Sequence, residues 1–230
     1  MDFSLTADQR LMQDSISGVL DRAAPLAAVR AFADGGECVA REPWAALVDL
    51  GVPGLLIAPE HGGLGLSLLD AALAAEVLGA RVAPAPFLGS AVLAPLAIAR
   101  AGSAAQQGEW LPRLAAGEIL AGVAINEAVA GARDGTGITA EAGRLTGSSL
   151  FAMDAAGADL LIVADRAGAL HLLAANAPGI EIIPQATIDR TRRFSEIRVD
   201  GAEAEPLPSG DALPRLRDAG WVMLAADMLG

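Results

Sequence analysis

The spacing of hydrophobic residues in the first half of the chain is that of α-helices. Thr6 and Gln9 form a capping-box pattern, in which two side chains bond the free N–H groups of a helix start. Five apolar residues at helical spacing follow: Leu11, Met12, Ile16, Val19 and Leu20. Residues 1–117 repeat such patterns and are predicted to form an all-helical amino-terminal domain.

Three further helix starts are marked within this segment. Pro43 suits a first helical position, and a helix from there ends at Gly51. Ser67 and Asp70 resemble a capping box for a helix that ends near Gly79 and is apolar on almost all sides, which predicts burial. Another helix begins at 103–106, and we expect its proline, Pro112, to break it.

The period changes to two at Glu118. Apolar runs at 160–164 and 170–174 flank a turn at 165–168, which predicts a hairpin. Ile197 and Val199 alternate with polar residues, as in a half-buried antiparallel strand. We predict that residues 118–208 form a small antiparallel β-barrel or sandwich domain.

A helical pattern returns in residues 209–230. Its apolar positions are Leu213, Leu216, Trp221, Leu224, Ala225, Met228 and Leu229. A single amphipathic helix cannot bury its own stripe, so we expect the first helix of a bundle whose remainder is absent. The predicted fold class is therefore α+β: helical domain, β domain, and the start of a second helical domain.

Composition narrows the classes of function. Hydrophobic residues make up 53% of the chain and the net charge is −12, which argues against disorder and against nucleic-acid binding. The single cysteine, Cys38, excludes a Cys-cluster metal centre, and the two histidines, His61 and His171, lie too far apart in the sequence for a ligand motif, which argues against a metal enzyme. The uncharged stretch 82–99 contains three prolines, so we interpret it as a buried loop and core helix rather than a membrane span. No basic region precedes an apolar run at the start, which predicts no signal peptide and a cytoplasmic protein.

Several short phrases occur in an order and spacing that resemble one known family. They are residues 1–6 (MDFSLT), 50–55 (LGVPGL), 59–65 (PEHGGLG), 76–79 (EVLG), 84–88 (PAPFL) and 110–118 (WLPRLAAGE). Each phrase alone is weak, but together they are similar to the acyl-CoA dehydrogenases. The resemblance covers nearly the whole chain. It implies an enzyme that removes two hydrogens from an acyl-CoA thioester, with FAD as hydride acceptor.

The resemblance also implies a flavin surface made by two segments of the β domain. In the first, Ile125 and Asn126 would face the flavin ring beside Val123, and Gly131 and Ala132 would lie near the pyrophosphate or the thioester ligand. Such a site needs N–H donors near the ring, where negative charge develops on reduction.

The second segment spans residues 145–155. Phe151 would pack against the flavin, Ala152 would follow it, and Met153 would lie beside the reactive ring nitrogen. The alternative is that Phe151 and Met153 are ordinary core residues of a strand. Clustered arginines at 190–193 could approach phosphates, although arginines in a turn are usually solvated.

The chain departs from the family pattern at four positions in these segments. Asn126 replaces a threonine, Ala128 a proline, Ala132 a serine and Ser149 a lysine. The family's catalytic glutamate lies in the carboxy-terminal bundle, so we assign no residue of this chain as the base and expect the chain alone to be inactive. Two alternatives stay open: a non-catalytic subunit of a heteromeric dehydrogenase, and a flavin monooxygenase of the same fold. Expected partners are an acyl-CoA, electron-transfer flavoprotein and further subunits in a homo- or hetero-oligomer.

Overall fold

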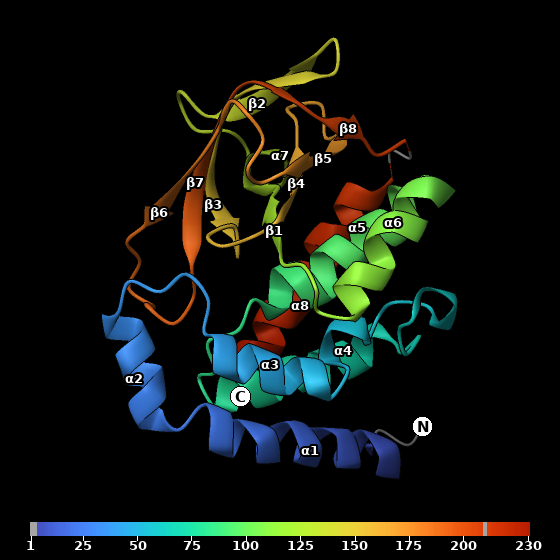
Figure 1. Cartoon of the computed structure of the whole chain (residues 1–230), viewed down its shortest axis with the longest axis vertical. Helices are drawn as coiled ribbons and strands as arrows, with labels where there is room; N and C mark the ends of the chain where they lie inside the picture. Colours follow the sequence, from blue (N-terminus) through green and yellow to red (C-terminus); the bar gives the residue numbers. More distant parts are fainter. Residues whose placement is uncertain (1–3, 209–210) are drawn as a thin grey trace.

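The computed structural model describes residues 4–208 and 211–230, so residues 1–3 of the opening phrase lie outside it. A helical layer is followed by a sheet and by one long helix (Figure 1). The helical layer contains α-helices α1 to α6, two short 3₁₀-helices (η1 and η2) and a π-helix (η3). Their bounds are α1 (Ala7–Ala23), α2 (Leu26–Asp34), α3 (Arg41–Asp49), η1 (Val52–Gly54), η2 (Pro59–His61), α4 (Leu68–Ala80), η3 (Leu88–Leu93), α5 (Ala94–Ala101) and α6 (Ala104–Ala115). The expected succession of helices and then strands is confirmed.

The helix starts follow the local sequence closely. At α1, the Gln9 N–H donates to Thr6 Oγ1 and the Thr6 N–H donates to Gln9 Oε1, both at 3.1 Å. The same reciprocal pattern begins α4 and α6, as predicted. One prediction was wrong: α6 continues through Pro112 to Ala115. Pro112 removes one N–H donor from the interior of α6, and the helix continues for three residues beyond it.

The strands that follow form one sheet, and the short helix α7 (Asn126–Ala130) lies between the first two of them. The strands are β1 (Ala121–Ala124), β2 (Gly137–Glu141), β3 (Arg144–Met153), β4 (Leu160–Ala164), β5 (Leu170–Ala174), β6 (Ile180–Gln185), β7 (Phe194–Glu203) and β8 (Glu205–Pro206). The strand order is β6-β7-β3-β1-β4-β5-β8, with β2 paired to β3. The predicted β4–β5 hairpin is present, with Leu160 opposite Ala174. The sheet is mixed rather than wholly antiparallel, because β1 and β4 pair in parallel.

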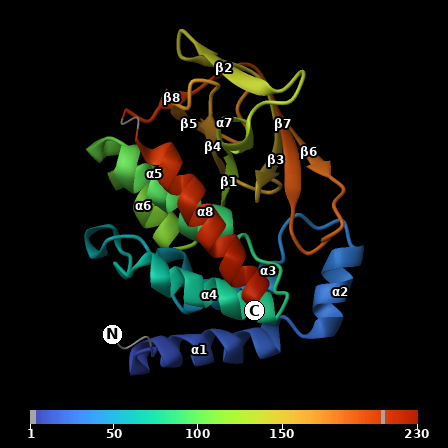
Figure 2. The ribbon, with the colours of Figure 1, turned by 180° about the vertical axis from the view of Figure 1, so that it is seen from behind.

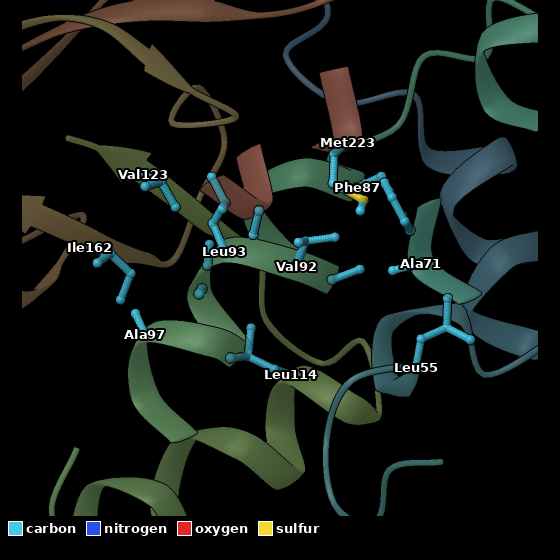
Figure 3. Packing of buried hydrophobic residues seen from close by; sticks show 14 of the residues in the cluster. Leu55, Ala71, Phe87, Val92, Leu93, Ala97, Leu114, Val123, Ile162 and Met223 are labelled. Carbon is cyan, nitrogen blue, oxygen red and sulfur yellow. The ribbon is translucent and has the colours of Figure 1, made fainter. Parts of the chain in front are cut away.

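One hydrophobic core joins the helical layer to the sheet. Val123 of β1 and Ile162 of β4 pack with Leu93, Leu114 and other helical residues in a single buried cluster (Figure 3). A second, smaller cluster lies on the other side of the sheet around Leu145, Leu161 and Ile197. The division of the chain into domains at residues 117 and 208 stays a prediction. Apolar residues from both sides of residue 117 pack in the same core cluster.

The last helix, α8 (Ala212–Leu229), runs along the back of the helical layer (Figure 2) and packs on α4, α5 and η3. Its buried positions are Ala212, Leu216, Ala219, Gly220 and Met223. The larger apolar residues point outward, with Trp221 59% and Met228 79% exposed. Gly79 of α4 lets the two helices lie close together, since a Cβ there would lie 2.0 Å from the Asp227 carbonyl oxygen, and the outer face of α8 carries exposed apolar residues.

Within residues 4–208 and 211–230, no helix is long and apolar enough to cross a membrane. The segment interpreted as a buried loop and core helix contains η3 and most of α5. Ala91, Val92 and Leu93 are fully buried there, which confirms that interpretation.

Candidate functional site

Two of the segments singled out from the sequence lie side by side in the sheet. β1 and β3 pair antiparallel, and Val123 lies directly opposite Met153. Val123, Ile125 and Met153 contact the same hydrophobic cluster, so the two segments face the same side of the sheet. Ala152, one residue earlier than Met153, faces the second cluster on the other side.

A bulge near the end of β3 changes the direction of one aromatic side chain. The register between β3 and β7 shifts between Ser149 and Ala152, and Phe151 has a φ of 56°. This left-handed conformation is rare for a bulky residue and often marks functional segments. The ring of Phe151 is 39% exposed, and the guanidinium carbon of Arg133 lies 5.3 Å from its centroid. The bulge therefore presents an aromatic ring outside the core.

Buried Glu127 of α7 holds this bulge in place. Its carboxylate accepts a hydrogen bond of 2.5 Å from Ser149 Oγ and another of 2.8 Å from the Leu150 N–H. On the far side, the Phe151 N–H donates to Gln185 Oε1 at 2.9 Å. Three consecutive residues of β3 are thus fixed by side chains of other elements. Ser149, at the position where the resemblance implies a lysine, bonds Glu127.

The predicted flavin-contacting residues differ in what they can offer a ligand. Val123, Ala152 and Ile125 are buried, so their side chains belong to the core. Asn126 and Met153 are half-buried, and Gly131 and Ala132 are exposed at the end of α7. Their proposed roles stay predictions. The accessible part of the site consists of Asn126, Phe151, Met153 and the 131–132 turn, which we call the β1–β3 face.

A cavity of about 250 Å³ adjoins this face at Met153. It lies between α4, α8, residues 85–88 and the facing ends of β3 and β7. Ten apolar residues line it: Ala75, Leu78, Ala85, Phe87, Leu88, Met153, Phe194, Met223, Leu224 and Met228. Five charged residues complete the wall: Asp154, Asp189, Arg192, Arg193 and Asp227. Met153 therefore belongs both to the β1–β3 face and to an apolar cavity with one polar side.

Asp154 connects the end of β3 to the start of η3. Its Oδ2 accepts a 2.8 Å hydrogen bond from the Gly89 N–H, and its own N–H donates to the Arg193 carbonyl. Burial raises the pKa of the Asp154 carboxyl to about 6, while the Gly89 hydrogen bond and the charge of Arg192 act in the opposite direction. A carboxyl group of altered acidity thus lines the cavity one residue after Met153.

The clustered arginines make contacts within the protein. Arg192 donates to the Ala83 carbonyl at 2.8 Å and pairs with Asp227 of α8. Arg193 donates to the carbonyls of Glu37 and Phe32 and stacks on the Phe32 ring at 4.1 Å. These contacts account for both arginines structurally and favour the interpretation without a phosphate.

From the sequence alone, no role is assigned to Asp154 or Glu127. A lone carboxylate near a turn is usually structural, and the structure gives Glu127 a structural role in the site. Asp154 follows Met153 directly, but its neighbour Gly89 lies 65 positions earlier. The one available signal was the position of Asp154 at the end of the phrase that carries Phe151 and Met153.

The β1–β3 face offers accessible groups of the kinds that bind a planar aromatic cofactor. Phe151 offers an exposed ring and Met153 a half-buried thioether, and a Cβ added at Gly131 would meet nothing within 4 Å. A metal site is not supported, since residues 4–208 and 211–230 contain no group of three His, Cys, Asp or Glu side chains able to hold an ion.

Comparison with known sequences gives a consistent result. Residues 6–118 match the family model described as the N-terminal domain of acyl-CoA dehydrogenase. The chain is 26% identical over 226 residues to acyl-CoA dehydrogenase IpdE2 of Mycobacterium tuberculosis. That alignment covers 97% of this chain and 59% of the relative, so the chain spans less than two thirds of the protein it matches.

Solved structures share the fold. The ChsE4-ChsE5 complex from Mycobacterium tuberculosis superposes with a TM-score of 0.88 at 24% identity, over 99% of this chain and 64% of that chain. A glutaryl-CoA dehydrogenase from Mycobacterium smegmatis in complex with FADH2 superposes with a TM-score of 0.74 at 22% identity, over 97% of this chain and 60% of that chain.

Proposed function

Since the chain belongs to the acyl-CoA dehydrogenase family, we propose that the protein it forms oxidises an acyl-CoA thioester between its α and β carbons, with FAD as the acceptor. The observation that carries this proposal is the double position of Met153. It lies opposite Val123 on the β1–β3 face and also lines the apolar cavity. A flavin ring on the face and an acyl chain in the cavity would therefore be neighbours.

FAD, when bound, would supply the hydride acceptor for the β-hydrogen of the acyl chain. Phe151 and Met153 would hold one side of its ring, and Asn126 with the 131–132 turn would hold its polar parts. The bonds from Glu127 fix the backbone that carries Phe151, so this surface is preformed. Residues of the cavity wall bind the chain and exclude water, which strengthens interactions with the developing enolate. No residue of this chain is assigned as the base that removes the α-proton.

Flavin binding tests this proposal directly. Phe151→Ala should raise the dissociation constant for FAD about tenfold, because an exposed aromatic contact of about 1–2 kcal/mol is lost. Ile188→Ala, at a fully exposed aliphatic position outside the β1–β3 face, is the matched control and should leave the constant unchanged. Titration of the apoprotein with FAD, followed by absorbance, measures both. Unaltered affinity in Phe151→Ala would reject the assigned face, and failure of the parent protein to bind FAD would reject the proposed cofactor.

A second candidate is a non-catalytic subunit of a heteromeric dehydrogenase. It is favoured by the replacements at Asn126, Ala132 and Ser149, and by the buried bond that commits Ser149 to Glu127. One solved relative of the same fold is itself a complex of two named chains. Purification with the product of the adjacent gene separates the two candidates: a stable complex with FAD only in the partner supports the subunit, and FAD bound by this chain alone supports the enzyme.

The electron acceptor that we propose is electron-transfer flavoprotein. A groove of about 520 Å³ beside α1 is lined in part by exposed leucines, with Leu11 66% and Leu64 50% accessible, as in protein docking surfaces. Leu64→Asp should slow reduction of the acceptor while substrate still reduces the bound flavin at the parent rate. Leu26→Asp, equally exposed but outside the groove, is the control. Equal rates for the two variants would place the contact elsewhere.

A further inference from the structure

We infer that Phe32 and Arg193 set the upper size of the acyl group, because they close a passage between the cavity beside Met153 and a groove beside α2. The inference rests on the proposed oxidation of an acyl-CoA and adds the residues that limit its chain length. Three observations carry it: the position of the groove, the small void between the two spaces, and the contacts of the Phe32–Arg193 pair.

The groove has a volume of about 430 Å³, and we call it the α2 groove. It is bounded by α2, residues 23–24, 35–37 and 40–43, and Pro84, and α2 lies at the edge of the molecule near the ends of β6 and β7 (Figure 1). Eleven of its fourteen lining residues are alanine, glycine, proline, valine or phenylalanine. Such a lining suits hydrocarbon, so the α2 groove has room for the end of a long acyl chain.

A void of about 10 Å³ lies between the α2 groove and the cavity. It shares three lining residues with each of them: Phe32, Ala40 and Pro84 with the groove, and Ala85, Asp154 and Arg193 with the cavity. One water molecule needs about 10–15 Å³, so the void is too small for an acyl chain. The two larger spaces are therefore adjacent but closed off from each other.

Two side chains in contact make this closure. Phe32 is 7% exposed and lines the α2 groove and the void, whereas Arg193 lines the void and the cavity. The guanidinium carbon of Arg193 lies 4.1 Å from the centroid of the Phe32 ring. Because each member of the pair borders one of the large spaces, the stacked pair forms the partition between them.

The loop that precedes β7 holds the pair in place. Arg193 donates to the Phe32 carbonyl at 2.9 Å, and Arg190 pairs with Asp34 at the end of α2. The nine residues of α2, all of which the structure describes, bury two side chains, Val29 and Phe32. The partition therefore depends on bonds from this loop as well as on the packing of α2.

With the passage closed, the cavity limits the acyl group. A cavity of about 150 Å³ holds one benzene ring, so about 250 Å³ holds on the order of ten carbon atoms. A longer chain leaves its remaining carbons in water, where further methylenes gain no burial. We therefore expect affinity to rise with chain length up to about ten carbons and then to level off.

Binding of decanoyl-CoA and myristoyl-CoA to the purified protein, measured by isothermal titration calorimetry, tests the inference. The parent protein should bind both within a factor of about three. Phe32→Ala should bind myristoyl-CoA at least about tenfold more tightly than decanoyl-CoA, because the additional methylenes become buried in the α2 groove. Arg193→Ala frees the Phe32 ring to turn aside and should shift the ratio in the same direction.

Val29→Ala is the matched control. Val29 is the other buried side chain of α2 and is 4% exposed, and it lines the α2 groove but not the void. This variant loosens α2 without opening the passage, so it should keep the ratio of the parent protein. A shift equal to that in Phe32→Ala would assign the effect to loosening of α2 and would overturn the inference.

The other outcomes are also distinct. Equal ratios in the parent protein and in Phe32→Ala would overturn the inference and leave the proposed function standing. So would a parent protein that already prefers myristoyl-CoA by about tenfold or more. That measurement decides alone if circular dichroism shows that the variants do not fold. If neither acyl-CoA binds the parent protein, the proposed function fails together with the inference.

Discussion

At the scale of single residues, two carboxylates shape the site in different ways: Glu127 is buried and Asp154 is half-buried. Glu127 accepts two hydrogen bonds from β3 and fixes a bulge, whereas Asp154 accepts one from Gly89 and faces the cavity. The first is a fully satisfied structural group. The second keeps acceptor capacity and has a raised pKa, which makes its protonation a measurable property of the fold.

Asp154→Asn should alter how stability depends on pH. The folded-state pKa of about 6 lies above the ordinary 3.8, so folding binds a proton more tightly and the associated stability is lost as pH rises from about 4 through 6. At pH 7.5 the variant should be more stable than the parent, by on the order of 2 kcal/mol, and the difference should vanish near pH 4. Thermal melts at both pH values measure it. A variant less stable than the parent at pH 7.5 would contradict the buried-charge account.

Ser149→Ala removes one of the two donors to Glu127 and leaves a buried carboxylate oxygen without a partner. The free energy of unfolding should fall by about 1–3 kcal/mol, as for hydrogen bonds to charged groups. Ser148→Ala is the neighbouring control, because Ser148 Oγ makes only a 3.4 Å contact to the Gly135 carbonyl. Urea denaturation compares the two, and equal losses would show that the Ser149 bond contributes nothing specific.

At the scale of elements, the helices were largely predictable and the site was not. The pairs Thr6–Gln9, Ser67–Asp70 and Ser103–Gln106 act over three residues, so the sequence alone reveals them. The bulge at Phe151 depends on two distant residues. Glu127 lies 23 positions before its partner Leu150, and Gln185 lies 34 positions after its partner Phe151. No local pattern encodes such a contact.

The approach of η3 to β1 is a second element-scale feature with a direct test. A Cβ at Gly89 would lie 2.3 Å from the Ala121 carbonyl oxygen, which is backbone and cannot move aside cheaply. Gly89→Ala should therefore lower stability by about 1–3 kcal/mol. Gly108→Ala, in α6 with open space around the added methyl, should raise it by about 0.5–1 kcal/mol through reduced backbone entropy. Opposite signs in urea denaturation are expected, and a neutral Gly89→Ala would mean that η3 lies farther from β1.

At the scale of the whole molecule, a few long-range contacts hold the last helix. Arg192 precedes β7 and joins the Ala83 carbonyl to Asp227 of α8. The outer face of α8, with Trp221 and Met228 exposed, could not be predicted, because its apolar positions do not reveal which of them α4 covers. The parallel pairing of β1 with β4 escaped for a similar reason, since it joins strands that β2 and β3 separate in the chain.

Arg192→Gln should loosen α8 without unfolding the sheet. The variant loses the half-buried pair with Asp227, so backbone amides of α8 should exchange their hydrogens about tenfold faster than in the parent, corresponding to about 1.4 kcal/mol. Arg198→Gln, which loses the bonds of an exposed arginine of β7 to Glu196 and Glu181, is the control and should change exchange in α8 little. Hydrogen exchange followed by mass spectrometry resolves the two, and uniform protection of α8 in Arg192→Gln would contradict this account.

The single core that passes from the helices into β1 and β4 also constrains how such a chain can evolve. A recombination event that exchanged residues 1–117 for the equivalent part of a distant homologue would bring together unmatched halves of one interior. Leu93 and Val123 would then need to change as a pair. Successful chimeras should therefore carry compensating substitutions on both sides of the junction, and the helical half and the sheet should be inherited as one unit.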